Sequence, residues 1–360
     1  MQKQYTKPDF SGQDIYFGMD VGLKGWKVAI MTRSLEHRVF TQPPDVDVLV
    51  NYLRRNFPGG RYHGVYEAGY CGFWIHDRMQ ERGVDCMVVN PADVPTKHKE
   101  RAFKSNRVDA RKLVRSLMNG ELEPIYVPNR RAMEDRSLTR SRHAFVKKQT
   151  RCKNQIKALL ALYGITVPEE DTETHWSRRY VAYLEQLKFQ RPSGDQALQS
   201  LLEELVFLRG MIARLTKQIR ALAREDQYRV SVGHLQSVCG LSMMSAMIIL
   251  TELVDVNRFG TLDQLAKYCG LVPGEHSTGE DQTITGITSR RNPILRWLLI
   301  ECAWVAARKD PALHLAFNKL AARMPKNKTI IRIARKLLNR IRFVLKNQKP
   351  YETCVAQATH

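Results

Sequence analysis

Three carboxylates, Asp20, Glu67 and Asp109, have the residue type and the placement to do chemistry in this chain. Each lies at the end or edge of a predicted element in a short β-rich N-terminal region. Cleavage of a phosphodiester needs an activated nucleophile and charge relief on the leaving oxygen. Two Mg²⁺ (or Mn²⁺) ions about 4 Å apart supply both when a few carboxylates hold them. The three acids therefore predict a metal site for phosphate chemistry, with Asp20 as the bridging ligand.

Each acid also has a structural interpretation. Asp20 could begin a turn, and Glu67 could be a surface acid at a strand end. Asn106 followed by Asp109 is a good helix start, with an N-cap amide and an acid in the first turn. Any one acid taken alone fits these roles better, but the three together at the expected topological positions favour the metal site.

The composition points to a polyanion as partner. The chain has 360 residues and a formal charge of +21, which attracts polyanions over long range and through counterion release. Its apolar content of 43% predicts folded domains and not a basic tail. No apolar run approaches the length of a membrane span, so we expect no membrane partner and a cytoplasmic, nucleoid-associated bacterial protein.

The elements around the acids form a predicted α/β domain. Apolar runs predict strands near residues 14–19, 27–32, 37–41, 62–66 and 85–89, and helices near 45–57, 73–82 and 107–118. The first three strands are separated by short turns, which favours antiparallel hairpins, whereas the later strands alternate with helices and favour right-handed crossovers. The result is one mixed sheet with the layout of a ribonuclease H-like fold. Asp20 and Glu67 would then lie at the carboxyl ends of neighbouring strands.

The middle of the chain is predicted to be helical. A long basic helix covers residues 136–163, and Pro192–Gly194 is expected to break the chain. The next helix carries apolar residues at alternating steps of three and four, which is a heptad seam. Its members are Leu198, Leu201, Leu205, Leu208, Ile212, Leu215, Ile219 and Leu222. Two packings remain open: a hairpin with the basic helix of the same chain, or a coiled coil between subunits.

Two features mark the C-terminal region. Ser237–Leu250 resembles a helix-hairpin-helix turn in which Gly240 would let backbone N–H groups approach a phosphate, although an ordinary helix start fits equally well. Beyond residue 289, basic residues dominate and acids are almost absent, which indicates a contact face for nucleic acid. The side chains expected to bind nucleic acid in the whole chain are Arg140, Lys147, Lys148, Arg151, Arg290, Arg291, Arg335 and Lys336.

Longer motifs make the chain similar to a known family, the DEDD insertion-sequence transposases, which are bridge-RNA-guided recombinases. The motifs that resemble their first, RuvC-like domain are FGMDVG (17–22), YEAGYCGFWIHDRMQERGVDCMVVNP (66–91) and KSNRVDARKL (104–113). Those that resemble their C-terminal transposase domain are SVCGLSMMSA (237–246), RFGTLDQLAKYCGLVPGEHSTGE (258–280) and GITSRRNPILRWLLIECAW (286–304).

The resemblance is colinear over nearly the whole chain and implies three domains. A RuvC-like metal-binding catalytic domain would cover residues 1–125, and a helical coiled-coil region would cover 126–230. A mainly α transposase domain, with the helix-hairpin-helix-like segment and a serine loop, would cover 231–360. The implied partners are double-stranded donor and target DNA, a noncoding bridge RNA that delegates sequence choice to base pairing, and further copies of the chain in a dimer or tetramer.

The resemblance also implies roles for individual residues. The family's four acids fall on Asp20, Glu67, Asn106 and Asp109, so an amide stands at the third position. An amide oxygen can ligate Mg²⁺ but brings no charge, so the metal site would rely on three acids.

The family's serine, which attacks DNA and becomes covalently linked to it, falls in the loop EHSTGE. Ser277 is the candidate, and a strict count from Leu271 gives Thr278 instead. A serine hydroxyl needs a base, a metal or both to act near neutral pH. The acids could supply this if the two domains meet at one composite site. Arg290 and Arg291 could clamp the scissile phosphate.

Two other functions use parts of the same pattern. A metal-dependent DNA nuclease or junction resolvase needs the acids but not Ser277. A nucleic-acid-binding protein with a decayed active site would account for Asn106. Trapped protein–DNA adducts separate the recombinase from the nuclease, and turnover that depends on Mg²⁺ separates both from the decayed protein.

Overall fold

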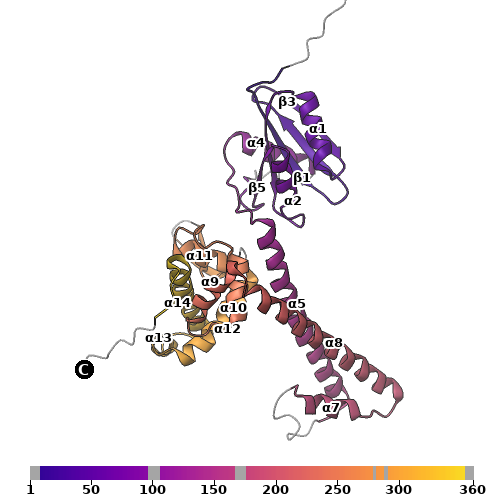
Figure 1. The fold of residues 1–360 in the computed structure, drawn as a ribbon, viewed down its shortest axis with the longest axis vertical. Helices are drawn as coiled ribbons and strands as arrows, with labels where there is room; N and C mark the ends of the chain where they lie inside the picture. The colour runs from indigo at the N-terminus through magenta and orange to yellow at the C-terminus, as the bar shows by residue number, and fades with distance from the viewer. Residues whose placement is uncertain (1–8, 96–105, 167–175, 279–280, 288–290, 353–360) are drawn as a thin grey trace, which may run out of the picture. The chain divides into compact units, whose positions relative to one another are not determined.

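The structure is a computed structural model that describes residues 9–95, 106–166, 176–278, 281–287 and 291–352. The contacts divide the chain into two compact units, Met1–Val127 and Pro128–His360 (Figure 1). The first unit is a mixed α/β structure, and the second consists mainly of helices. No helix in the described ranges is long and apolar enough to cross a membrane.

Within its described residues, the first unit holds a five-stranded sheet in the order β3-β2-β1-β4-β5. The strands and helices are β1 (Asp14–Val21), β2 (Trp26–Met31), β3 (Glu36–Gln42), α1 (Val46–Asn56), β4 (Arg61–Glu67), α2 (Trp74–Glu81), β5 (Asp85–Val89) and α4 (Asn106–Met118). β1, β2 and β3 pair antiparallel, while β4 lies parallel to both β1 and β5. The predicted mixed sheet and its order of elements are confirmed.

The two faces of this sheet have different cores. Because side chains alternate along a strand, Ile15, Phe17 and Met19 of β1 share one face, where they pack against α1 and α2. The other face is covered by α4. The backbone of α4 approaches β1 at Gly18, where an added Cβ would lie 2.5 Å from the carbonyl oxygen of Ala110. A glycine at this position is what allows the first turns of α4 to lie against β1.

The second unit is built from helices and a β-hairpin. Its elements are α5 (Arg130–Leu162), α7 (Arg178–Gln186), α8 (Pro192–Leu222), α9 (Asp226–Gln236), α10 (Met243–Leu253), α11 (Leu262–Cys269), β6 (Pro273–Thr278), β7 (Asp281–Ile287), α12 (Pro293–Lys309), α13 (Pro311–Ala321) and α14 (Lys326–Asn347). One core joins the end of α8 to the helices from α9 to α14. Another lies between α5, α7 and α8, and Figure 1 shows α5 and α8 side by side.

The apolar seam of α8 packs within the chain. Three predicted seam residues, Leu198, Leu205 and Leu208, are buried in the core shared with α5 and α7. The predicted Leu201 is only partly buried, and its neighbour Leu202 is buried instead. The hairpin within one chain is therefore present, and a coiled coil between subunits stays a prediction. The expected break at Pro192–Gly194 is wrong, because these residues form the first turn of α8. Proline is favoured there, since its fixed φ suits the helix and its missing N–H would have no helical partner.

The segment between α9 and α10 has a structural explanation. Ser242 is the N-cap of α10 and forms a capping box with Ser245. Gly240 has a φ of +93°, and an added Cβ would lie 2.6 Å from the carbonyl oxygen of Cys302 in α12. The glycine thus permits a left-handed backbone and a close helix approach. These contacts favour an ordinary helix start, and phosphate binding at this turn stays a prediction.

Candidate functional site

Asp20 and Glu67 lie at the same level on neighbouring strands of the mixed sheet. β1 and β4 are parallel, and Met19 pairs with Tyr66 in their register. Asp20 and Glu67 occupy the next position on each strand, so they share one face near the carboxyl ends. Both residues are half-buried. This edge therefore presents two adjacent carboxylates that are 47 positions apart in the sequence.

The face that carries these two acids is the one that α4 covers. Gly18, two residues before Asp20, contacts the backbone of α4. Val65, two residues before Glu67, shares a small core with α4. Asp109 is half-buried in the first turn of α4, beside the residue that meets Gly18. The structure thus brings all three predicted acids to one side of the sheet.

Two further groups lie beside Asp20 that the sequence did not single out. Lys27 pairs with Asp20 across the antiparallel β1–β2 ladder and therefore lies on the same face, where its ammonium group donates to the hydroxyl of Thr41 at 3.0 Å. The hydroxyl of Tyr70, in the glycine turn after β4, donates to the carbonyl oxygen of Val21 at 2.9 Å. Desolvation raises the pKa of Tyr70, and the charge of Asp20 adds to this. The cross-strand register could have indicated Lys27, but no sequence signal indicated Tyr70.

The donors at this edge suit a hard cation. Carboxylate oxygens are the ligands that Mg²⁺ and Mn²⁺ prefer. Among the described residues, however, no three Asp, Glu, His or Cys side chains lie close enough together to hold an ion. The backbone of Asn106 begins α4, and its side chain lies outside the described part of the chain. The carboxylate oxygens fit a divalent metal ion. To bind one, the side chains of Asp20, Glu67 and Asp109 must come closer together than they are in this structure.

Ser277 and Thr278 are the last two residues of β6, beside the turn of the β6–β7 hairpin. Ser277 pairs with Gln282 and Thr278 with Asp281, while residues 279–280 lie outside the described ranges. The expected polar loop is wrong for this segment, since Pro273–Thr278 is a strand. β7 has the β-branched residues that favour strands, and β6 pairs with it to form the hairpin.

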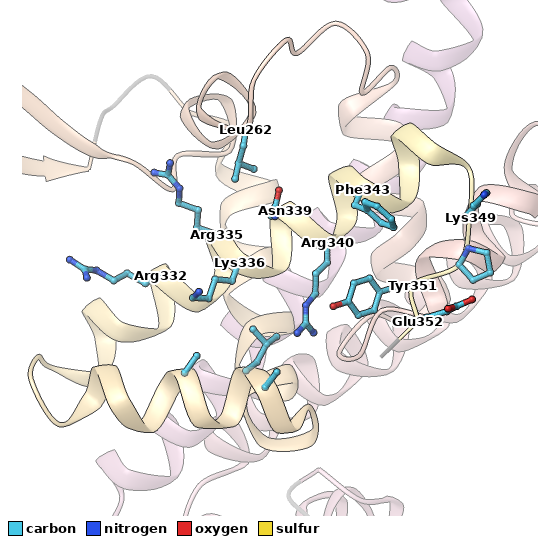
Figure 2. A pocket seen from close by; sticks show the side chains of 14 residues that line it. Leu262, Arg332, Arg335, Lys336, Asn339, Arg340, Phe343, Lys349, Tyr351 and Glu352 are labelled. Atoms are coloured by element: carbon cyan, nitrogen blue, oxygen red, sulfur yellow. The ribbon is translucent and has the colours of Figure 1, made fainter. Parts of the chain in front are cut away.

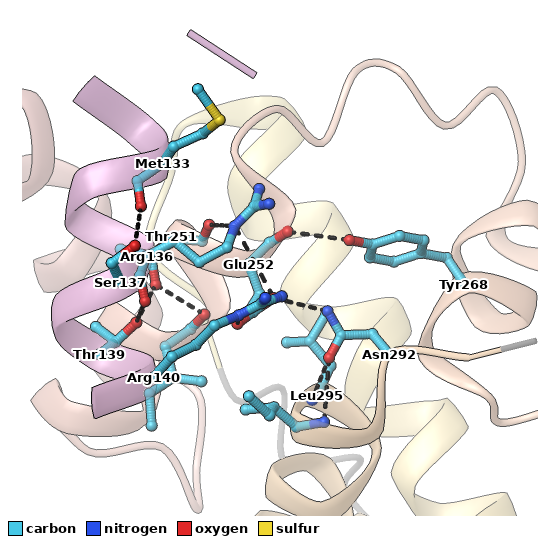
Figure 3. A network of polar contacts seen from close by, with 12 residues as sticks. Met133, Arg136, Ser137, Thr139, Arg140, Thr251, Glu252, Tyr268, Asn292 and Leu295 are labelled. Atoms are coloured by element: carbon cyan, nitrogen blue, oxygen red, sulfur yellow. Dashed lines mark hydrogen bonds and ion pairs between the residues drawn. The ribbon is translucent and has the colours of Figure 1, made fainter. Parts of the chain in front are cut away.

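A buried carboxylate network contacts residues on both sides of this hairpin. The side chain of Glu252 in α10 is 0% exposed. It accepts hydrogen bonds from Nε and Nη2 of Arg140 at 2.7 and 2.8 Å and from Nδ2 of Asn292 at 2.7 Å (Figure 3). Burial alone would raise the pKa of Glu252. The hydrogen bonds and charge of Arg140, together with Asn292 and Arg136, hold this pKa below its ordinary value.

The same network fixes both flanks of the hairpin. Tyr268 lies in α11, just before β6, and its hydroxyl donates to the backbone oxygen of Glu252 at 3.2 Å. Asn292 lies after β7, and its N–H donates to the backbone oxygen of Tyr268 at 2.8 Å. The Asn292 side chain also caps α12 by accepting from the N–H groups of Ile294 and Leu295. Sequence reasoning missed Glu252, which lies in none of the motifs, and Tyr268, which lies in the motif 258–280 but has no chemical pattern around it.

The predicted nucleic-acid contacts fall into three groups. Arg140 holds Glu252, and Arg335 forms an ion pair with Asp263, so both have structural partners. The side chains that are exposed on α5, on α14 or before α12 are Lys147, Lys148, Arg151, Arg291 and Lys336. Arg290 lies outside the described residues. Contact of these side chains with nucleic acid stays a prediction.

Comparison with known proteins identifies the class. Residues 17–165 match the model of a DEDD transposase family of the IS110 type, and residues 232–318 match the transposase IS116/IS110/IS902 family. The chain is 34% identical over 239 residues to y4qE of Sinorhizobium fredii, which is named as a transposase. This match covers 66% of the chain and 57% of y4qE, so the chain matches less than two thirds of that relative.

A second relative is named for its mobile element. The chain is 26% identical over 294 residues to the transposase for insertion sequence element IS1111A of Coxiella burnetii, covering 80% of the chain and 78% of that protein. The two family models match the chain in colinear order: the first covers most of the first unit and continues through α5, and the second lies within the second unit. The chain belongs to the IS110/IS116/IS902 family of insertion-sequence transposases.

Proposed function

We propose that this protein is the recombinase of an insertion sequence and that it cuts and rejoins donor and target DNA. The observation that carries the proposal is the in-register placement of Asp20 and Glu67 at the carboxyl ends of neighbouring parallel strands, with Asp109 of α4 on the same face. This strand order, three antiparallel strands followed by parallel crossovers, supports a ribonuclease H-like, RuvC-like first unit. Fold alone does not fix chemistry, so the acids carry the argument.

The acids are proposed to bind Mg²⁺ or Mn²⁺. A bound divalent ion would neutralise charge on the scissile phosphate and assist departure of the leaving oxygen. Asp20, Glu67 and Asp109 would hold it, with the amide oxygen of Asn106 as an uncharged supplement. Lys27, which pairs with Asp20 across the two strands, would offset part of the negative charge at this edge when no metal ion is bound.

Ser277 is proposed as the nucleophile. Its Oγ attacks phosphorus and loses its proton to a general base, and one bridging P–O bond breaks. That bridging oxygen leaves as a free hydroxyl once it is protonated. The product is a phosphodiester between DNA and the serine, and it retains the free energy of the phosphodiester bond that was broken in the DNA. A hydroxyl of another DNA strand can therefore displace the serine and rejoin DNA without an external energy source. The Glu252 network fixes Tyr268 and Asn292, which lie before and after the segment that carries Ser277.

The remaining partners follow from the family and the charge. A structured noncoding RNA would select the DNA sequences, and the exposed cations of α5 and α14 would hold nucleic-acid backbones. Assembly into a dimer or tetramer would bring two DNA partners together, and the complex would be associated with the nucleoid.

The test is a recombination assay with donor and target duplexes, Mg²⁺ and the RNA that co-purifies with the protein. Ser277→Ala should abolish joined products and the protein–DNA adduct seen after denaturation, whereas Thr278→Ala should retain both. Asp20→Asn should abolish cleavage while RNA and DNA binding remain. Activity that persists in Ser277→Ala would refute the serine role.

Two outcomes would assign a different function. Mg²⁺-dependent cleavage without any adduct would identify a nuclease or resolvase. Binding without turnover, unchanged by Asn106→Asp, would identify a protein with a decayed site.

A further inference from the structure

A groove of about 1030 Å³ runs along α14 in the second unit (Figure 2). One wall is a stripe of α14, and the other is formed by the first half of α13 and the residues that follow α14. Among the lining side chains are Leu313 of α13, Arg332, Lys336 and Phe343 of α14, and Lys349 and Tyr351 after α14. The α14 residues that line the groove, from Arg332 to Phe343, recur at three- and four-residue steps, so they share one helix face.

The groove is strongly cationic. Five basic side chains line it, against one acidic side chain, Glu352. Two of the five have partners: Arg340 donates to the buried Asp310 at 2.6 Å, and Arg335 pairs with Asp263. The other three have no ion-pair partner within the described part of the chain, and these are Arg332, Lys336 and Lys349. Arg332 and Lys336 lie one turn apart, about 6 Å along the helix axis.

The groove also offers apolar and aromatic surface. Phe343 is 52% exposed although it belongs to a helix whose other large apolar side chains face the core. Its ring lies about 10 Å along α14 from Lys336, on the same lining face. Leu313, Ala312 and Ala316 of α13 provide an apolar wall opposite the basic stripe. A ligand of this groove therefore needs anionic groups at one side and flat apolar groups at the other.

We propose that this groove binds a single-stranded segment of nucleic acid, with phosphates on Arg332, Lys336 and Lys349 and a base stacked on Phe343. A duplex presents phosphates outward and keeps its base faces stacked inside, so it would leave the ring and the apolar wall unused. An unpaired strand offers both groups, and sequence-tolerant single-strand sites combine basic grooves with aromatic platforms. The net charge of +21 favours this polyanion over a weakly charged peptide.

This inference deepens the nucleic-acid binding in the proposed function, but it depends on neither the acids nor Ser277. The test measures anisotropy of labelled oligouridylate, oligothymidylate and a duplex, each of about ten nucleotides per strand. Phe343→Ala should weaken single-strand binding about tenfold and leave duplex binding within about twofold. Lys336→Ala should reduce the slope of log affinity against log salt by about 0.7.

Matched controls lie on the same two helices outside the groove. Lys328→Ala removes an exposed cation of α14, and Leu315→Ala removes an apolar side chain of α13 that is 69% exposed. Lys328→Ala should reduce the salt slope less than Lys336→Ala does, and Leu315→Ala should leave single-strand affinity unchanged. Photocrosslinking with 5-iodouracil substituted in each oligonucleotide should place the crosslink on Phe343 or Tyr351. If Phe343→Ala loses more affinity for oligouridylate than for oligothymidylate, the groove binds RNA. If it loses more affinity for oligothymidylate, the groove binds DNA. Either result supports the proposal.

Three results would overturn the proposal. Equal losses for single strand and duplex would indicate a general electrostatic surface. Polyglutamate binding that depends on Phe343 while oligonucleotide binding does not would indicate an acidic peptide site. A shift in sedimentation of Phe343→Ala without a change in affinity would indicate self-association. Because recombination is measured separately with Ser277→Ala, failure of the proposed function and failure of this groove give different results.

Discussion

Arg140→Ala should destabilise the second unit by about 3 kcal/mol, although Arg140 looks like a surface cation of a basic helix. The side chain of Glu252 is 0% exposed, while that of Arg140 is 50% exposed. Removing Arg140 deletes two charge-assisted hydrogen bonds and leaves a buried carboxylate with Asn292 and with Arg136, whose Nε is 4.0 Å away. We expect the low end of the free energy usually lost when a buried ion pair is broken. Folding removes part of the water around Arg140, and this cost offsets some of the stability that the ion pair contributes to the wild-type protein.

The measurement is urea unfolding of the full chain, followed by far-ultraviolet circular dichroism. Lys147→Ala is the matched control, since it removes an exposed cation from the same helix and should change stability by no more than about 0.5 kcal/mol. The double variant Arg140→Ala/Glu252→Ala should recover part of the loss, because the unpaired buried charge is then absent.

The pH dependence of the stability lost in Arg140→Ala tests whether the unpaired charge of Glu252 causes the loss. The pKa of Glu252 in the folded protein lies below its ordinary value of 4.5, so the pair stabilises the fold above that pH and loses its effect as pH falls through the folded pKa. In Arg140→Ala, burial without the arginine raises the pKa of Glu252. The deficit should therefore be largest near neutral pH and shrink in acid. An unchanged unfolding midpoint combined with weaker DNA or RNA binding would refute this reasoning and make Arg140 a nucleic-acid contact.

Three further variants test other contacts. Gly18→Val should destabilise the first unit by about 3 kcal/mol, because even a Cβ would lie 2.5 Å from the backbone of α4; thermal unfolding measures this, and an unchanged midpoint would contradict the close packing. Asp310→Ala should cost about 3 kcal/mol by removing the N-cap of α13 and the partner of Arg340. Arg340 holds the pKa of Asp310 below 3.8 against the effect of burial, so this loss should persist down to about pH 4 in urea titrations. Leu205→Ala should destabilise the α5–α8 hairpin by about 3 kcal/mol with no change in sedimentation, whereas dissociation of an oligomer would show that α8 also joins subunits.

The mixed sheet could be predicted because its signals are local. Strand-length apolar runs between short turns identify β1, β2 and β3, and the alternation of strands and helices then requires parallel crossovers. Asp20 and Glu67 follow from this topology, since the ends of neighbouring parallel strands meet at one edge. Gly18 carried no such signal, because its role depends on α4, about 90 residues further along the chain.

The second unit was harder to predict because its important contacts join distant segments. Arg140 and Glu252 are 112 residues apart, and nothing in either neighbourhood indicates a pair. The segment Pro273–Thr278 has serine, glycine and proline in a loop-like composition, and only pairing with β7 makes it a strand. Local composition therefore misassigned the backbone of the segment that carries Ser277.

The same contacts change what the positive charge means. On both α5 and α14, arginines pair with a fully buried acid: Arg140 and Arg136 with Glu252, and Arg340 with Asp310. These cations are matched within the fold and contribute little to the field outside it. The exposed cations on the same helices, such as Lys147 and Lys336, keep their attraction for a phosphate backbone. A count of basic residues along a helix therefore overestimates its contact face for nucleic acid, and the salt dependence of binding should follow the exposed cations alone.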